Sequence, residues 1–183
     1  MKVKTENSLI VNPFQRVAGW TALFIGLSTM LISGLMAGYY GAHFPDLVTV
    51  IFTVSTGKYV PIVELLYGWF LLSIWSILAF LIFRIQRFRV IDLFGSIALA
   101  RAPYILIAGL NAAIYHSLIP FNQSIILPLL LVLVGWSFVW IYHALRVSGN
   151  LKGTKALVIF IIVGILSELT FLLTLSKIYL LIL

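Results

Sequence analysis

Five long runs of apolar residues, each with at most two charged residues, constrain this chain more than any other feature. They cover residues 17–42, 62–83, 91–115, 125–145 and 156–176. A helix rises about 1.5 Å per residue, so about 20 apolar residues cross the hydrocarbon core of a bilayer. Each run is therefore long enough to cross a membrane. We predict an all-α integral membrane bundle of five transmembrane helices.

The composition excludes a water-soluble protein. Hydrophobic residues make up 62% of the 183 residues and charged residues only 9%, whereas a soluble domain carries roughly 25% charged residues to cover its surface. Soluble enzyme classes are excluded on this ground. The absence of cysteine also excludes disulfides, thiol catalysis and cysteine metal sites. Transmembrane β-strands do not fit, because the runs are continuously apolar and about twice too long.

The connections between the runs are short, so we expect one five-helix transmembrane domain, residues 17–183, behind a short N-terminal tail, residues 1–16. The tail has basic residues but no apolar run ahead of a cleavage site, so we expect no signal peptide. A further apolar stretch, residues 47–54, would extend only about 12 Å as a helix and is too short to cross. We expect it to lie at the interface or to pack on the bundle.

Basic residues alternate between the two sides of the predicted bundle. By the positive-inside rule, their bias predicts a cytoplasmic N-terminus and a C-terminus outside or in a lumen. It also accounts for the net charge of +7 without nucleic acid, which we do not expect as a partner. We expect a multi-pass protein of the plasma or bacterial inner membrane, or of an endomembrane in a eukaryote. Nine basic residues lie on one side and two on the other: Lys2, Lys4, Arg16, Arg84, Arg87, Arg89, Arg146, Lys152 and Lys155 against Lys58 and Lys177.

Arg101 is the most informative residue of the chain. It lies twelve residues beyond Arg89, about 18 Å along a helix and so near the middle of the membrane. A central arginine costs about 2.5–3.5 kcal/mol on insertion scales and needs a partner or a water-filled cavity. Glu168 lies at a comparable depth in the fifth run, and Glu64 is expected nearer the outer surface. We therefore predict an Arg101–Glu168 pair, direct or through water.

Two interpretations of this pair remain open. It either fixes the register of the helices or belongs to an ion or substrate pathway. We group Arg101, Glu168 and Glu64 with Asn111 as a candidate intramembrane polar cluster. The other polar residues expected to face inward are few: His116, Ser167, Thr170 and Thr174.

Two residues of the third run are expected to shape its helix. Pro103 has no amide hydrogen and frees the carbonyl four residues earlier, so we predict a kink beside Arg101 and another donor for that carbonyl. Asp92 stands at the start of the same helix, beside Arg87 and Arg89. We expect it to cap the helix and to complement the positive end of the helix dipole.

Small residues recur through the first run at spacings of three and four, and they include the pattern Gly34-x-x-x-Gly38. This pattern is typical of helices that pack closely in lipid. Packing against other helices of the same chain is the simpler interpretation. Self-association, or contact with another membrane protein, through Gly34 and Gly38 is the alternative.

The three histidines do not have the spacing of a metal site. His43 and His116 are expected at the outer end of the bundle and His143 at the other, so at most His43, Asp46 and His116 would meet. A zinc site needs its ligands at one level, and we expect neither a metal nor a cofactor. No serine lies in a nucleophile-elbow pattern and no glycine-rich phosphate loop is present.

Two segments carry a family resemblance. The third run contains IDLFGSIALARAPYIL, in which Asp-x-x-Gly is followed by Leu-x-Arg-x-Pro, and a later segment reads GWSFVWIYHALRVSGNLKGTKALVIFIIV. These resemble the third span and the fourth-to-fifth span region of the Yip family, the Ypt/Rab-interacting five-span membrane proteins. The resemblance covers about residues 14–180, and its matching positions are Asp92, Gly95, Arg101, Pro103 and Trp136.

The resemblance implies a non-enzymatic scaffold or interaction protein in membrane organisation or trafficking. Eukaryotic members of the family are linked to Rab GTPase binding through a long cytoplasmic N-terminal region. Only about sixteen residues precede the first run here, so we expect a compact prokaryotic-type member and do not expect Rab binding. The alternative function is that of a small transporter, channel or lipid-handling protein with an intramembrane cavity around Arg101.

Overall fold

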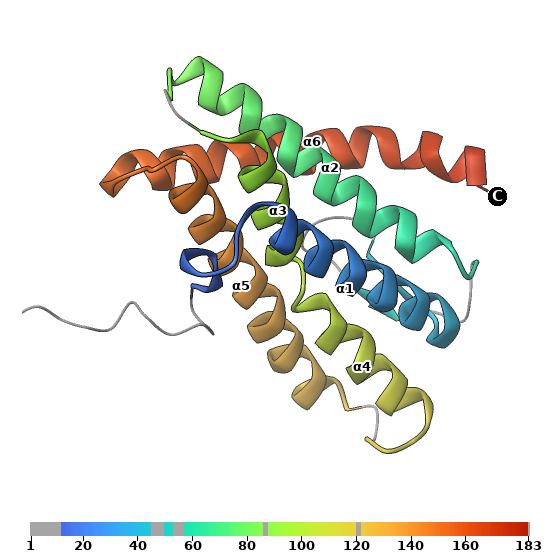
Figure 1. Cartoon of the computed structure of the whole chain (residues 1–183). Helices are drawn as coiled ribbons and strands as arrows, with labels where there is room; N and C mark the ends of the chain where they lie inside the picture. Colours follow the sequence, from blue (N-terminus) through green and yellow to red (C-terminus); the bar gives the residue numbers. More distant parts are fainter. Residues whose placement is uncertain (1–11, 45–49, 53–56, 86–87, 120–121, 183) are drawn as a thin grey trace, which may run out of the picture.

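The computed structural model describes residues 12–44, 50–52, 57–85, 88–119 and 122–182. Within these ranges the chain is a bundle of helices with one very short pair of strands (Figure 1). The elements in chain order are η1 (Pro13–Gln15), α1 (Gly19–Tyr40), β1 (Ala42–His43), β2 (Ile51–Phe52), α2 (Val60–Ile82), α3 (Val90–Ala100), α4 (Tyr104–Tyr115), α5 (Gln123–Ser148) and α6 (Gly153–Ile182).

The prediction of five membrane-spanning segments is confirmed at the level of length and hydropathy. Each predicted run matches a helical stretch that is long and apolar enough to cross a bilayer, with ends that differ by a few residues. The third stretch consists of α3 and α4 together. The stretches are Gly19–Tyr40, Val60–Ile82, Val90–Tyr115, Gln123–Ser148 and Gly153–Thr174.

The helices pack so that the third span occupies the middle of the bundle. α1 contacts α3 more extensively than any other two described helices contact each other, and it also packs on α4 and α2. α5 covers another side of α3, and α6 packs mainly on α2 and to a lesser extent on α5 (Figure 1). As a result, 61% of an apolar 18-residue stretch of the third span is buried, against 28% of such a stretch in the fourth and in the fifth. A polar group in the third span is therefore more shielded than one in α5 or α6.

Glycines allow α1 to approach its neighbours. Gly34 and Gly38 both lie on the buried side of α1, against the start of α2. A β-carbon on Gly34 would stand 2.7 Å from Ile62, and one on Gly38 only 2.0 Å from the carbonyl oxygen of Lys58. Packing within the chain, the simpler interpretation of this pattern, is confirmed. Self-association stays a prediction.

The connection between α1 and α2 contains the two strands. Ala42 pairs with Phe52, and His43 pairs with Ile51, in an antiparallel arrangement. The predicted interfacial stretch, residues 47–54, is described only at residues 50–52, where two of its residues form β2. This pair is the one departure from the all-α prediction among the described residues.

The described end of the N-terminal tail belongs to the fold. Residues 1–11 lie outside the description. Pro13–Gln15 forms the short helix η1, and the buried ring of Phe14 meets Trp140 of α5 edge to face at 6.1 Å. The tail therefore reaches α5 before the chain enters α1.

Candidate functional site

The third span is interrupted at Arg101. α3 ends at Ala100 and α4 begins at Tyr104, and the residues between them form tight turns. The amide of Ala102 donates to the carbonyl of Leu99 at 2.9 Å. This is the carbonyl that Pro103 leaves without its usual helical donor. The predicted kink at Pro103 is confirmed and is a complete break in the helix.

A serine of α5 forms a hydrogen bond with the backbone at the break. Ser137 is buried, and its Oγ donates to the carbonyl oxygen of Ala100 at 2.9 Å. In a continuous helix the amide of Tyr104 would bond this carbonyl, but here it donates to the carbonyl of Arg101 at 3.1 Å. A free carbonyl in lipid costs several kcal/mol. The sequence did not mark Ser137 as its donor.

The side chain of Arg101 is sealed inside the bundle. It is 1% exposed, and its Cζ lies 4.4 Å from the centroid of the Tyr104 ring. None of its three side-chain nitrogens has a hydrogen-bond partner among the described residues. A guanidinium carries five N–H donors, and a cation–π contact stabilises its charge without using them. Arg101 therefore combines high burial with unused donors.

The prediction of a direct Arg101–Glu168 ion pair is wrong, because the two side chains are not paired in the described part of the chain. The nitrogens of Arg101 meet no carboxylate there, and α6, which carries Glu168, packs on α2 and α5. The prediction rested on equal depth in the membrane. Depth does not say which helices are neighbours, and α2 and α5 are the principal neighbours of α6.

Glu64 is buried at another place, near the end of the bundle that carries the strand pair. It is 2% exposed, and its Oε2 accepts a hydrogen bond from the amide of Phe44 at 2.7 Å. Its Oε1 lies 3.6 Å from Nδ1 of His43. The ring of Phe44 in turn meets that of Tyr104 edge to face at 5.3 Å. Two aromatic rings thus connect the surroundings of Glu64 to those of Arg101.

Asn111 satisfies the end of α1. Its side-chain amide donates to the carbonyl of Tyr40 at 2.9 Å. Tyr40 is the last residue of α1, so no amide of that helix bonds its carbonyl. Asn111 thus bonds the end of α1, whereas the described contact of the Arg101 guanidinium is with the Tyr104 ring. The candidate cluster of Arg101, Glu168, Glu64 and Asn111 is not a single hydrogen-bonded group among the described residues.

Two of the predicted inward-facing threonines link α6 to α2. Nε1 of Trp75 donates to Oγ1 of Thr170 at 3.0 Å, and the hydroxyls of Tyr67 and Thr174 lie 2.6 Å apart. These are interhelical bonds of the kind that hold membrane helices together.

Asp92 does not cap α3 with its side chain. The cap residue is Arg89, and its side chain makes no capping hydrogen bond. The carboxylate of Asp92 instead lies 3.6 Å from Nε of Arg89, in the first turn of the helix. This position complements the positive end of the helix dipole, so that part of the prediction holds. Arg87 lies outside the described residues.

The other matching positions of the resemblance lie at helix contacts. Gly95 of α3 faces α1, where a β-carbon would stand 2.3 Å from the carbonyl oxygen of Gly19. Trp136 of α5 meets Trp140 edge to face at 5.8 Å and packs against the core around Tyr104.

The histidines do not gather around a metal. Nδ1 of His43 lies beside the carboxylate of Glu64, and Nε2 of His116 lies 3.3 Å from the hydroxyl of Tyr40. Asp46 lies outside the described residues. Within the described ranges no three His, Cys, Asp or Glu side chains are grouped as metal ligands.

A basic hollow at one end of the bundle was not predicted. It has a volume of about 390 Å³ and is lined by Arg84 and Ile85 after α2, residues 149–152 after α5, and Lys155 of α6. The sequence marked its basic residues only as orienting charges. Their shared predicted side of the membrane was the signal that they could meet.

No family model, no curated protein and no solved structure matches this chain. Five apolar helices are consistent with a multi-pass membrane protein. Any more specific function has to be argued from the interior around Arg101 and from the surface of the bundle.

Proposed function

We propose that this chain is a non-enzymatic multi-pass membrane protein with a scaffold or interaction role in membrane organisation or trafficking, as in the Yip family. The observation that carries the proposal is the 1% exposure of Arg101. A pathway for solute through the middle of the bundle would have to reach this charge, and α1, α2 and α5 pack around the third span. A closed core of this kind suits a protein that works through its outer faces.

The positions of the Yip resemblance support the same proposal. Asp92, Gly95, Arg101 and Pro103 follow one another along the central span, and Trp136 packs on the core beside them. Four of the five positions are thus in the span with the largest buried share. These residues shape the core and do not form an open site for chemistry. A scaffold requires residues of this kind.

The orientation follows from the basic residues. The described connections after α2 and α5 both carry basic residues and form one end of the bundle. We place this end and the N-terminus in the cytoplasm because cytoplasmic loops carry an excess of Lys and Arg.

Thiol labelling tests whether the core is closed to water. The chain has no cysteine, so an introduced cysteine carries the only thiol of the protein. Ser137→Cys places a thiol beside the Arg101 break with little change in volume. Thr154→Cys and Ser124→Cys, at exposed positions near the two ends of the bundle, are the controls. In sealed vesicles we expect a membrane-impermeant thiol reagent to label the controls, each from one side, and to leave Ser137→Cys unmodified. Labelling of Ser137→Cys at a comparable rate would refute the closed core.

A test of the interaction role uses photo-crosslinking in the native membrane. Val132 of α5 and Leu173 of α6 are 65% and 74% exposed, so a photoreactive side chain there meets lipid or another protein. We expect a discrete protein adduct from at least one of them, and none from the buried Leu133 beside Val132. Adducts with lipid alone at both positions, together with solute flux in vesicles, would contradict the scaffold role.

One observation favours a second function, a transporter, channel or lipid-handling protein for a small anionic substrate. Discontinuous membrane helices often form binding sites near the middle of the bilayer, and the break at Arg101 leaves guanidinium donors unused among the described residues. Under this alternative, a conformational change exposes Arg101. The same Ser137→Cys experiment decides, because labelling that a small anion blocks would support this function.

A further inference from the structure

The basic hollow is built by two helices that end in the same way. At the end of α2 the amide of Ile85 donates to the carbonyl of Phe80, and at the end of α5 the amide of Leu151 donates to that of Arg146, both at 2.8 Å. These bonds, which span five residues, define the Schellman motif. The same motif at both ends turns Ile85 and Leu151 toward the bundle, where they line the hollow.

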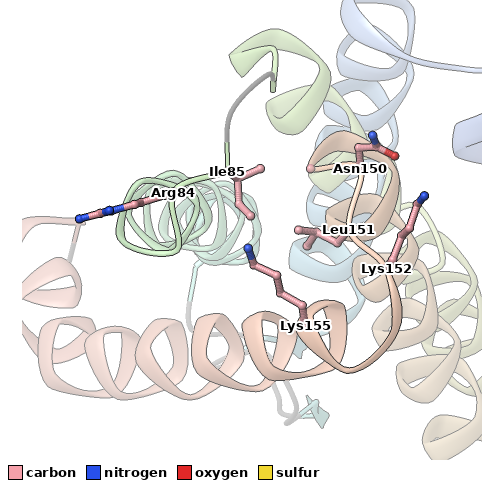
Figure 2. Close-up of a pocket in the computed structure, with 7 residues that line it drawn as sticks. Arg84, Ile85, Asn150, Leu151, Lys152 and Lys155 are labelled. Carbon is pink, nitrogen blue, oxygen red and sulfur yellow. The ribbon is translucent and has the colours of Figure 1, made fainter.

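The motif also places two polar residues at the edge of the hollow. Its left-handed residue is Arg84 after α2, with φ of 52°, and Asn150 after α5, with φ of 46°. Glycine is the usual residue here because it has no β-carbon. An arginine and an asparagine take its place at the edge of the hollow, and Figure 2 shows the guanidinium of Arg84 directed away from Lys155.

Lys155 lies at the centre of this arrangement. Figure 2 shows its ammonium group pointing between Ile85 and Leu151, while Arg84 and Lys152 extend to opposite sides. Nζ of Lys155 donates to the carbonyl of Phe83 at 3.2 Å, which fixes the side chain at the end of α2. An ammonium has three donors, so this bond leaves two for a ligand.

The charge of the basic hollow is of one sign. Arg84, Lys152 and Lys155 line it, and none of its described lining residues is acidic. None of these three cations is in an ion pair with a described residue, since the described pairs join His43 to Glu64 and Arg89 to Asp92. α6 begins at Gly153 at the same place, and the positive end of its dipole adds to the potential. The ligand that fits is an anion.

The surroundings of the hollow are apolar. Leu81 and Ile82, in the last turn of α2, are exposed, and so are Leu157 and Val158 of α6. These side chains lie within predicted membrane spans, next to the level of the hollow. A ligand with a phosphate in the hollow can therefore lay hydrocarbon chains along α2 and α6. Basic pockets between transmembrane helices are suited to anionic lipid head groups.

We propose that the basic hollow binds the phosphate group of an anionic phospholipid. Lys155 supplies the positive charge inside the hollow, and the exposed Arg84 and Lys152 at its edge add to the potential. Asn150 supplies an amide donor, and the exposed ends of α2 and α6 hold the acyl chains. The site does not depend on the scaffold role proposed above. It gives the bundle a preference for membranes rich in anionic lipid.

Fluorescence measures the binding directly. The chain, labelled on Thr154→Cys with an environment-sensitive dye beside the hollow, is titrated in detergent with dihexanoyl phosphatidylglycerol, dihexanoyl phosphatidylcholine and inorganic phosphate. We expect the phosphatidylglycerol to bind at least tenfold more tightly than either of the others. Equal affinity for phosphatidylcholine, or for inorganic phosphate, would overturn the proposal, because the site would then recognise the chains alone or the phosphate alone.

Charge variants locate the site. The pair Arg84→Gln and Lys155→Gln is expected to weaken phosphatidylglycerol binding about thirty-fold, since a basic residue near an anionic surface is worth about a factor of five. The matched control removes two exposed charges elsewhere, Arg16→Gln and Lys58→Gln, and is expected to leave the affinity within twofold. An equal loss in the control would mean that binding follows the net charge and not the hollow.

Two further variants distinguish a loss of binding from a loss of folding. Lys152→Gln lies in an exposed loop and is expected to weaken binding about fivefold with no change in melting temperature. Lys155→Arg keeps the charge and is expected to retain at least half of the wild-type affinity. Wild-type affinity in Lys152→Gln, or full loss in Lys155→Arg, would contradict recognition by charge in this hollow.

Discussion

The backbone of Gly95 in α3 lies so close to Gly19 at the start of α1 that a β-carbon on Gly95 would stand 2.3 Å from the carbonyl oxygen of Gly19. Two turns further along α1, a β-carbon on Gly26 would stand at the same distance from the backbone of Ala98. Small residues let membrane helices approach until their backbones touch. The contact of α1 with the central span therefore depends on the absence of side chains at these positions.

Gly95→Ala is expected to destabilise the bundle by about 1–3 kcal/mol, because the methyl group pushes two backbones apart. The matched control is Gly109→Ala in α4, where nothing lies within 4 Å of the added carbon. There we expect a gain of about 0.5–1 kcal/mol, since alanine favours the helix over glycine. Reversible unfolding of the purified protein in mixed detergent measures both. Equal stabilities of the two variants would show that α1 and α3 are not in contact.

Ser137→Ala is expected to lower the free energy of unfolding by about 0.6–1.5 kcal/mol, because it removes the only described side-chain donor to the Ala100 carbonyl. Ser28→Ala, at an exposed position of α1, makes the same chemical change and is expected to alter stability by less than about 0.5 kcal/mol. The same unfolding assay applies. A loss in Ser28→Ala as large as in Ser137→Ala would assign the effect to the serine side chain in general and not to the break.

Arg101→Met is expected to stabilise the bundle by about 1–4 kcal/mol. Burial of an ion costs several kcal/mol, while a desolvated cation–π contact such as that with Tyr104 returns about 2 kcal/mol or more, and no hydrogen bond of the guanidinium to a described residue adds to it. Methionine fills a similar volume without the charge. A melting temperature above that of the wild type is the expected result. A clear decrease would mean that Arg101 makes bonds that hold the bundle together, as the predicted pair with Glu168 required.

The number and length of the spans can be predicted from the sequence because lipid imposes both. Every backbone group in the hydrocarbon must be bonded within its own helix, so an apolar run of the right length has one structure available. The break at Pro103 is predictable for the same reason, since proline removes one of those bonds. The bond from Ser137 to the neighbouring carbonyl of Ala100 was not predictable, because it depends on which helix lies beside α3.

Helix neighbours are the part of the fold that the sequence leaves open. An apolar 18-residue stretch of the fifth span is 28% buried, and the lipid-facing side chains of this span are as apolar as its core, so hydropathy does not show which side of α6 packs. Glu168 was therefore assigned to Arg101 on depth alone. The basic hollow was missed for the same reason: Arg84 and Lys155 are far apart in the sequence, and only the packing of α6 on α2 brings them together.

Glu64→Leu is expected to destabilise the bundle by about 1–3 kcal/mol, because the amide of Phe44 then loses its acceptor in a buried place. Glu64→Gln is the matched control, since its side-chain oxygen can accept the same bond while the charge beside His43 is lost. If the hydrogen bond to Phe44 dominates, the glutamine variant retains most of the wild-type stability in the detergent unfolding assay. Equal losses in the two variants would instead assign the role of Glu64 to its charge and to the contact with His43.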